Sequence, residues 1–289
     1  EAQPMNFKNS EALVTCEWLE AHLNDPDLRI IDATYHLPHA DRDAYEEWTF
    51  RHIPGSVHFD IDKVADTTSG LPHMLPNAST FADALSQLGI SNSHKIVVYD
   101  ANGGYMAACR VWWMLRTFGY ENAAVLDGGL VRWGKERRPL EHDEPIVRPA
   151  TFSASFNPAL VKSKADMVAN LESGEYQVID ARNEGRFKGI DHEPRPTERR
   201  GHIPGSLNLP FTLLTPPSHD FTFQSPVEIA EILDAEGVDL NKPTIATCGS
   251  GVTACVVAFA MYLLGNEDVA VYDGSWAEWG DSSDVPIGE

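Results

Sequence analysis

Short apolar runs alternate along this chain with longer stretches in which apolar residues recur at helical spacing. The clearest helical periods cover residues 80–88 and 226–236. The apolar runs have four or five residues and lie at 28–32, 95–99, 123–126, 177–180, 244–247 and 268–272. Continuous apolar runs of this length are typical of strands buried on both faces. Strands that alternate with helices predict an α/β fold with mostly parallel sheets flanked by helices.

The second half of the chain repeats the first. The pentapeptide HIPGS occurs at 52–56 and again at 202–206, and Asp-Gly followed by tryptophan occurs at 127–133 and 273–279. The copies stay between 146 and 150 residues apart throughout. This regularity predicts two homologous domains, 1–140 and 159–289, joined by a proline-interrupted linker over 141–158.

A cysteine follows the apolar run at 244–247. Cys248 opens the sequence CGSGVTA, which leads into an apolar helical stretch. Backbone N–H groups of such a loop, and the positive end of the helix behind it, favour a thiolate and lower the pKa of a thiol. Gly249 and Gly251 allow the tight turn. We therefore predict that Cys248 is a nucleophile on an exposed loop. Cys255, within the helix, fits a buried structural role.

The first half has lost the equivalent cysteine. Asp100 stands in its place and begins a longer loop, and Cys109 lies too far into the following helix to replace it. The second half is therefore predicted to be the catalytic domain and the first a supporting one. Because ligands bind at the carboxyl ends of parallel strands, we expect the active site between the two domains.

Composition narrows the classes of function. The 289 residues include 22 Lys and Arg against 43 Asp and Glu, a net charge of −21, which argues against nucleic acid and anionic membranes as partners. No apolar stretch reaches the roughly 20 residues of a membrane span, and no signal-peptide pattern is visible. Four scattered cysteines without a C-x-x-C motif favour a reducing compartment, the cytoplasm or, in a eukaryote, the mitochondrion. The histidines show no metal-ligand spacing, so we predict no metal.

The motifs together resemble those of the tandem-rhodanese sulfurtransferases over nearly the whole chain. The two HIPGS copies, the sequence GSWAEWG at 274–280 and the six-residue cysteine loop carry this resemblance. Thiosulfate-using members place basic residues after the cysteine, whereas Gly249 and Ser250 make this loop similar to that of 3-mercaptopyruvate sulfurtransferases. The resemblance implies that Cys248 takes the sulfur of 3-mercaptopyruvate as a persulfide and releases pyruvate. Thioredoxin, a small thiol or cyanide then accepts the sulfur, without a cofactor.

The resemblance also implies roles for other residues. Arg186 and Arg195 would bind the substrate, because a planar guanidinium suits its carboxylate and carbonyl groups. Ser250, His73 and Asp62 would form a proton relay, although a purely structural role for His73 is equally open. The other loop residues expected at the substrate are Gly249, Gly251, Val252 and Thr253.

Three alternatives remain open at this point. A thiosulfate:cyanide sulfurtransferase would share the fold and differ in its sulfur donor. A cysteine-dependent phosphatase is disfavoured, since it needs a longer loop and an arginine about six residues after the cysteine, where this chain has Ala254. A persulfide carrier or binding module without turnover is compatible with the same residues.

Overall fold

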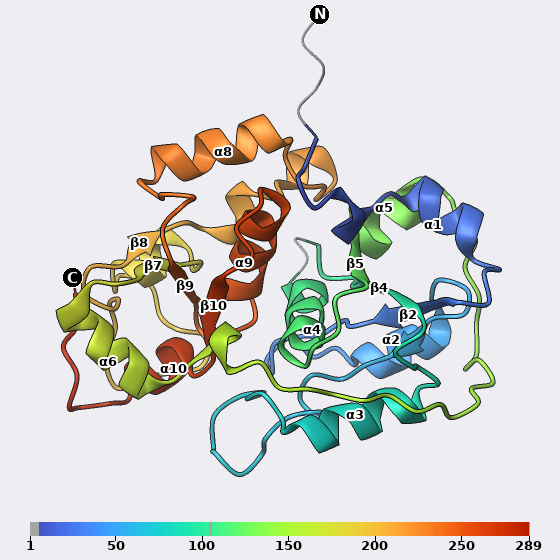
Figure 1. The fold of residues 1–289 in the computed structure, drawn as a ribbon, viewed down its shortest axis with the longest axis horizontal. Helices are drawn as coiled ribbons and strands as arrows, with labels where there is room; N and C mark the ends of the chain where they lie inside the picture. Colours follow the sequence, from blue (N-terminus) through green and yellow to red (C-terminus); the bar gives the residue numbers. More distant parts are fainter. Residues whose placement is uncertain (1–5, 104–105, 289) are drawn as a thin grey trace, which may run out of the picture.

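Two five-stranded parallel sheets lie at opposite ends of the molecule (Figure 1). The structure is a computed structural model that describes residues 6–103 and 106–288. In the first sheet the strands follow the order β1 (Leu13–Val14), β5 (Ala123–Leu126), β4 (Lys95–Tyr99), β2 (Leu28–Asp32), β3 (Val57–His58). In the second they follow the order β6 (Val161–Lys162), β10 (Val269–Tyr272), β9 (Thr244–Thr247), β7 (Gln177–Asp180), β8 (Leu207–Asn208). The sequence repeat is thus a repeat of topology, and the predicted α/β fold is confirmed.

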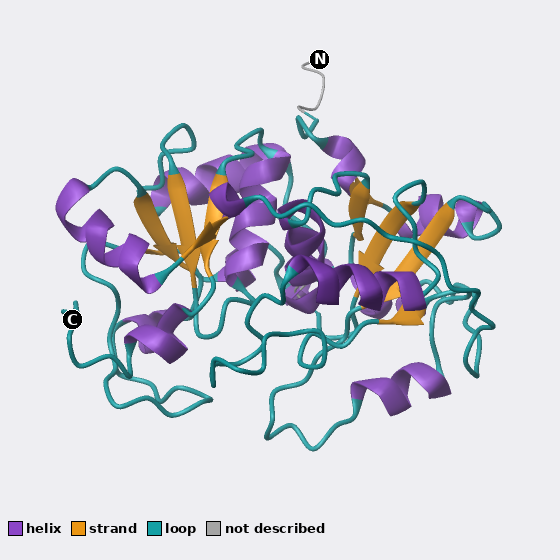
Figure 2. Ribbon diagram, turned by 60° about the horizontal axis from the view of Figure 1, so that its bottom comes forward, coloured by secondary structure: helices purple, strands orange, loops and turns teal. Residues whose placement is uncertain are grey.

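Helices surround and separate the two groups of strands (Figure 2). The helices of the first half are α1 (Cys16–His22), α2 (Ala44–Phe50), α3 (Ala78–Gln87), α4 (Met106–Thr117) and α5 (Gly129–Lys135). Those of the second half are α6 (Lys164–Ser173), α7 (Glu184–Phe187), α8 (Pro226–Ala235), α9 (Ala254–Leu263) and α10 (Ser275–Trp279). Short 3₁₀ turns are η1 (Ser10–Ala12), η2 (Pro158–Leu160), η3 (Phe211–Leu213) and η4 (Pro217–His219).

Local side chains explain where the two predicted helices begin. The side chain of Asn77 accepts a hydrogen bond from the Thr80 N–H at the start of α3. At the start of α8, Ser225 and Glu228 form a capping box around Pro226 in the first turn. The longest helix, α4, has 12 residues, and within residues 6–103 and 106–288 no helix has the length and hydropathy that a membrane crossing requires.

The two halves share an apolar core at their junction, where α4 and α9 pack side by side (Figure 1). The Trp112 ring on α4 meets two rings of α9 edge-on, with centroids 4.7 Å from Phe259 and 5.0 Å from Tyr262. Each helix follows the loop that begins with Asp100, after β4, or with Cys248, after β9. Their packing therefore fixes the two equivalent loops relative to each other.

The segment between α5 and η2 runs along the first half. Its backbone N–H groups at Ala150 and Ser155 donate to the carbonyls of Ser86 and Phe118. An isolated bridge also pairs Glu141 with His52 of the first HIPGS motif. The predicted linker is thus attached to one domain by regular hydrogen bonds.

Candidate active site

Cys248 is held rigidly between β9 and α9. Its Sγ accepts a hydrogen bond from the Gly251 N–H at 3.1 Å. Its own N–H donates to Ser275 Oγ at 3.1 Å, and its carbonyl accepts from the Trp276 N–H at 2.9 Å. Gly251 adopts a φ of +86°, a conformation that suits glycine and turns its N–H toward the sulfur.

The expectation of an exposed cysteine is wrong. Cys248 is only 2% exposed, because the loop folds inward beneath α10 and the neighbouring half of the chain. The residue nevertheless lines a cavity of about 210 Å³, through which a small molecule can reach it. The loop therefore shields the sulfur while leaving one side open to a ligand.

Residues from both halves line this cavity. The first half contributes Tyr35, Leu37 and Met106. Seven of the residues singled out from the sequence line it from the second half: Arg186, Arg195, Cys248, Gly249, Ser250, Val252 and Thr253. The cavity thus lies between the two domains, as the strand ends indicated.

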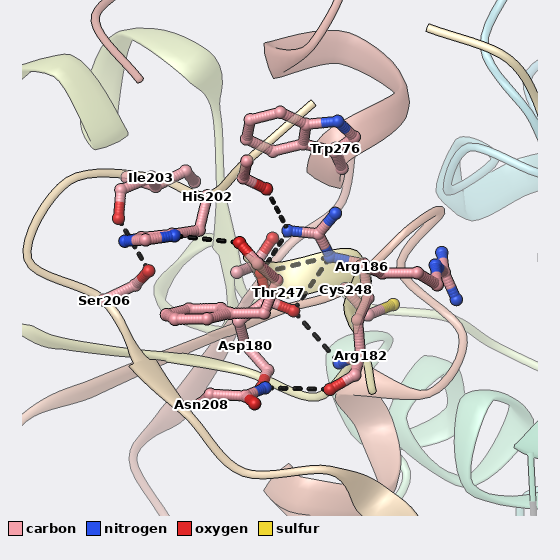
Figure 3. A network of polar contacts seen from close by, with 12 residues as sticks. Asp180, Arg182, Arg186, His202, Ile203, Ser206, Asn208, Thr247, Cys248 and Trp276 are labelled. Carbon is pink, nitrogen blue, oxygen red and sulfur yellow. Dashed lines mark hydrogen bonds and ion pairs between the residues drawn. The ribbon is translucent and has the colours of Figure 1, made fainter. Parts of the chain in front are cut away.

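Arg186 is oriented by a carboxylate. It lies on the short helix α7, and its Nε donates to Glu193 Oε2 at 3.0 Å. The other oxygen of Glu193 accepts from Arg182 Nη1 at 2.6 Å, and Arg182 pairs in turn with the buried Asp180. In Figure 3 the Arg186 guanidinium and the Cys248 sulfur extend to the same side of this network. Arg186 Nη2 also donates to Glu193 Oε2, and among residues 6–103 and 106–288 no hydrogen bond occupies Nη1, which leaves it available to an anion in the cavity.

Gly249 makes room for Arg186. A Cβ atom at position 249 would lie 2.4 Å from Arg186 Nη2, well inside van der Waals contact. The guanidinium therefore packs directly against the backbone of the cysteine loop. A larger residue at position 249 excludes Arg186 from its present place.

Arg195 connects the cavity to the other domain. Its Nη2 donates a hydrogen bond to the Tyr35 hydroxyl, which belongs to the first half of the chain. Both residues line the cavity that contains Cys248. A ligand there would therefore meet two guanidinium groups, one positioned by each half of the molecule.

His73 and Asp62 form a pair, but Ser250 is not bonded to it. His73 Nδ1 lies 3.1 Å from Asp62 Oδ1, and the His73 ring stands edge-on to Tyr35 at 5.4 Å between centroids. Burial lowers the pKa of His73 and outweighs the hydrogen bond to Asp62, which raises it. Within residues 6–103 and 106–288, no hydrogen bond joins His73 to Ser250, and His73 Nε2 is buried without a partner. Two members of the predicted relay are thus together and the third is separate.

In the first half a carboxylate occupies the position of the thiol. Asp100 Oδ1 accepts from the Asn102 N–H at 3.1 Å, and Asp100 Oδ2 accepts from the Ala108 N–H at 2.9 Å. Burial raises the pKa of Asp100 to about 6, although these backbone donors oppose the shift. Backbone N–H groups thus hold the Cys248 sulfur in one half and the Asp100 carboxylate in the other.

Sequence reasoning missed several residues of the site. Arg110 reaches the cysteine loop from α4, and Glu193 positions Arg186. A single signal pointed to Arg110, since it is a charged residue within the apolar sequence of α4. Two of its partners, Gly251 and Asp273, lie more than 140 positions away, so the sequence alone could not locate them.

Comparison with known proteins identifies the family. The Rhodanese-like domain family matches residues 15–136 and 163–282, and the chain belongs to this family. It is 44% identical to the 3-mercaptopyruvate sulfurtransferase of Mus musculus over 96% of this chain and 94% of the mouse protein. It is also 43% identical to the thiosulfate sulfurtransferase of Rattus norvegicus over 93% of this chain and 91% of the rat protein.

A solved structure agrees with this assignment. The crystal structure of SseA from Escherichia coli, described as a 3-mercaptopyruvate sulfotransferase with the rhodanese fold, superposes with a TM-score of 0.83. The match is 41% identical in sequence and covers 92% of this chain and 99% of SseA. The resemblance to tandem-rhodanese sulfurtransferases is thereby confirmed.

Proposed function

We propose that this chain transfers the sulfur of 3-mercaptopyruvate through a persulfide on Cys248 to a thiol acceptor. One observation carries the proposal: Cys248, whose sulfur is held by the Gly251 N–H, lines the same cavity as Arg186 and Arg195. A nucleophilic cysteine and two arginines on the wall of one cavity suit a small anionic donor with a transferable sulfur.

The first transfer step balances without a cofactor. The Cys248 thiolate attacks the donor sulfur, an S–S bond forms, and the C–S bond of 3-mercaptopyruvate breaks. The electron pair of that bond passes to carbon and gives the enolate of pyruvate. The proton of the donor thiol ends on that carbon, so the products are pyruvate and a Cys248 persulfide anion. The Gly251 N–H would stabilise the negative charge on sulfur before and after transfer.

The persulfide then passes its outer sulfur to an acceptor. A thiolate of thioredoxin or of a small thiol attacks the outer sulfur, and the Cys248 thiolate leaves. Thiolate acceptors require a reducing environment, which agrees with four free cysteines in the chain. We therefore place the protein in the cytoplasm or, if its source is a eukaryote, in the mitochondrion.

The choice of donor follows from position 249. Relatives that use either donor share similar identity with this chain, so identity alone does not distinguish them. Gly249 supplies no cation for the dianion thiosulfate, and Arg186 already occupies the space where a side chain at 249 would lie. The cavity instead offers Arg186 and Arg195 to the carboxylate and carbonyl of a keto acid.

We assign the proton transfer to His73 with Asp62, with Ser250 as the third member. A hydrogen bond from Nδ1–H to Asp62 leaves Nε2 as the basic nitrogen. The lowered pKa of His73 keeps this nitrogen unprotonated near neutral pH. Replacement of His73 by Asn should lower kcat and remove one limb of its pH profile, and an unaltered profile excludes the relay.

Mass spectrometry tests the central step. After exposure to 3-mercaptopyruvate, the peptide that contains Cys248 should gain the mass of one sulfur, which thioredoxin removes. Steady-state assays with equal concentrations of 3-mercaptopyruvate and thiosulfate should show a higher kcat/KM for the former. No adduct would support a binding module, and a higher kcat/KM for thiosulfate would support the alternative donor.

The two arginines provide the matched test of substrate binding. Arg186→Ala and Arg195→Ala should each raise KM at least tenfold, which corresponds to about 1.4 kcal/mol of lost pairing. Arg200→Ala is the control, because Arg200 donates to the Ile190 carbonyl at 3.2 Å and is not among the residues that line this cavity in the described part of the chain. Unchanged KM in both cavity variants would exclude this assignment.

A further inference from the structure

The proposed chemistry leaves one buried charge unexplained. Arg110 lies on α4 of the half without a nucleophile, and none of its surface is exposed. Burial of a guanidinium costs several kcal/mol unless its charge and N–H groups are matched. Within the described part of the chain, its Nε has no hydrogen-bond partner, so the match is incomplete. The burial of this charge therefore depends on the contacts of its two terminal nitrogens.

The other nitrogens of Arg110 join the parts of the site. Nη1 lies 2.6 Å from Asp273 Oδ1 and donates to the Gly251 carbonyl at 3.2 Å. Nη2 donates to the His73 carbonyl at 2.9 Å. The second oxygen of Asp273 accepts from the Leu75 N–H at 2.7 Å. One ion pair thus connects α4, the loop of His73, the cysteine loop and the end of β10.

The contact with Gly251 bears directly on the sulfur. Arg110 holds the carbonyl of this residue, while its N–H is the donor to Cys248 Sγ at 3.1 Å. Because Gly251 has the φ freedom of glycine, its own conformation does not fix these two groups. The same carbonyl accepts from Cys255 Sγ at 3.3 Å within its own domain, and Arg110 adds a charged donor to it from the other domain.

The sequence repeat has no arginine at the equivalent position of the second half. Asp127, 146 residues before Asp273, accepts from the Phe223 N–H at 2.9 Å, the counterpart of the Leu75 contact. The position 146 residues after Arg110 is Val256 on α9. Both halves thus keep the aspartate contact across the junction, but the arginine is present only where it faces a cysteine.

We propose that Arg110 and Asp273 form a positioning pair for the reaction: Arg110 holds the cysteine loop and the His73 loop in the arrangement that sulfur transfer requires. The first domain then contributes to chemistry that takes place on the second. This inference rests on the proposed role of Cys248 as nucleophile. The other charged or titratable groups near the loop include Cys255 on α9, Arg186 with Glu193, Arg195, and His73 with Asp62 from the first half.

Arg110→Lys tests the pair, since lysine keeps the charge but cannot make three contacts with a planar fork. The rate of Cys248 alkylation by iodoacetamide, followed by peptide mass spectrometry, is measured against pH together with kcat and KM. We expect the midpoint of alkylation to move to higher pH and kcat to fall about tenfold, with KM within about twofold of wild type. Asp127→Asn is the control, and it should leave all three quantities unchanged.

Each outcome can be assigned. A folded Arg110→Lys variant with the wild-type alkylation profile and kcat overturns the positioning role. If this variant does not fold, Asp273→Asn should show the same two changes, and wild-type behaviour there overturns the role as well. Loss of folding in both variants would assign the pair to stability alone. Failure of iodoacetamide to modify Cys248 selectively in the wild type would instead reject the proposed nucleophile.

Discussion

At the scale of single residues, Gly249 controls the approach of Arg186 to the cysteine loop. Gly249→Ala places a methyl group 2.4 Å from Arg186 Nη2 without requiring a left-handed backbone, so the guanidinium must move. We expect KM for 3-mercaptopyruvate to rise at least fivefold, about 1 kcal/mol, with a smaller change in kcat. Gly134→Ala is the matched control, because nothing lies within 4 Å of its added Cβ. Equal KM values for the two variants would contradict the role of Gly249.

A second single residue, Asp100, makes the free energy of unfolding depend on pH. Its pKa of about 6 in the folded state exceeds the ordinary value of 3.8. The folded state therefore binds more protons than the unfolded state between these values, and stability falls as the pH rises through this window. Asparagine does not titrate, so this fall in stability is absent from Asp100→Asn. Between pH 4 and pH 7 the unfolding free energy of the wild type should therefore fall by up to about 3 kcal/mol more than that of the variant.

Urea denaturation at several pH values measures this difference. The exposed Asp234 provides the control, and Asp234→Asn should follow the wild type across the range. A constant difference in unfolding free energy between wild type and Asp100→Asn, from pH 4 to pH 7, would show that Asp100 is not the group responsible.

At the scale of elements, the contact between α4 and α9 depends on Trp112. Its ring meets Phe259 and Tyr262 edge-on and is almost fully buried. Trp112→Ala should reduce the free energy of unfolding by about 3–5 kcal/mol, as expected for a large cavity in a core. Trp112→Phe keeps one ring at the junction and should lose less. A loss below about 1 kcal/mol for the alanine variant would show that the two helices repack freely.

The elements also show how far the sequence alone could lead. Five of the six apolar runs became strands with the predicted bounds, and the sixth, β10, begins one residue later. These central strands are buried on both faces, so their apolar runs are continuous. The two-residue edge strands β1, β3, β6 and β8 were not predicted, because two residues carry no period and their pairing depends on neighbours distant in sequence.

The candidate active site was likewise predicted only in part from the sequence. The cysteine loop was recognisable because its chemistry is contiguous in sequence, and Arg186 and Arg195 stood out through the family resemblance. The burial of Cys248 and the contacts of Arg110 arise from packing between the halves, which no local pattern encodes. Local motifs therefore indicated which residues to consider, while the packing of the domains determines what surrounds them.

At the scale of the whole molecule, the two domains should unfold as one cooperative unit. A single buried apolar cluster includes Ile96 and Val98 of β4, Ala246 of β9 and the facing sides of α4 and α9. If α4 and α9 separate, apolar surface of both domains is exposed to water. Hydrogen exchange followed by mass spectrometry should therefore give amides of β4 and β9 opening free energies equal within about 1 kcal/mol.

Hydrogen exchange of the Trp112→Ala variant distinguishes two cases. The two domains either share one core or have similar stability by coincidence. Loss of packing at the junction should lower the protection of β4 and β9 together, since both depend on the surface that α4 and α9 bury. Faster exchange in β4 alone, with β9 protected as in the wild type, would show that the domains open independently. In that case the first domain could move away from the cysteine loop while the second domain stays folded. Cooperative loss would instead mean that every opening of the junction also removes Arg110 and Tyr35 from the site.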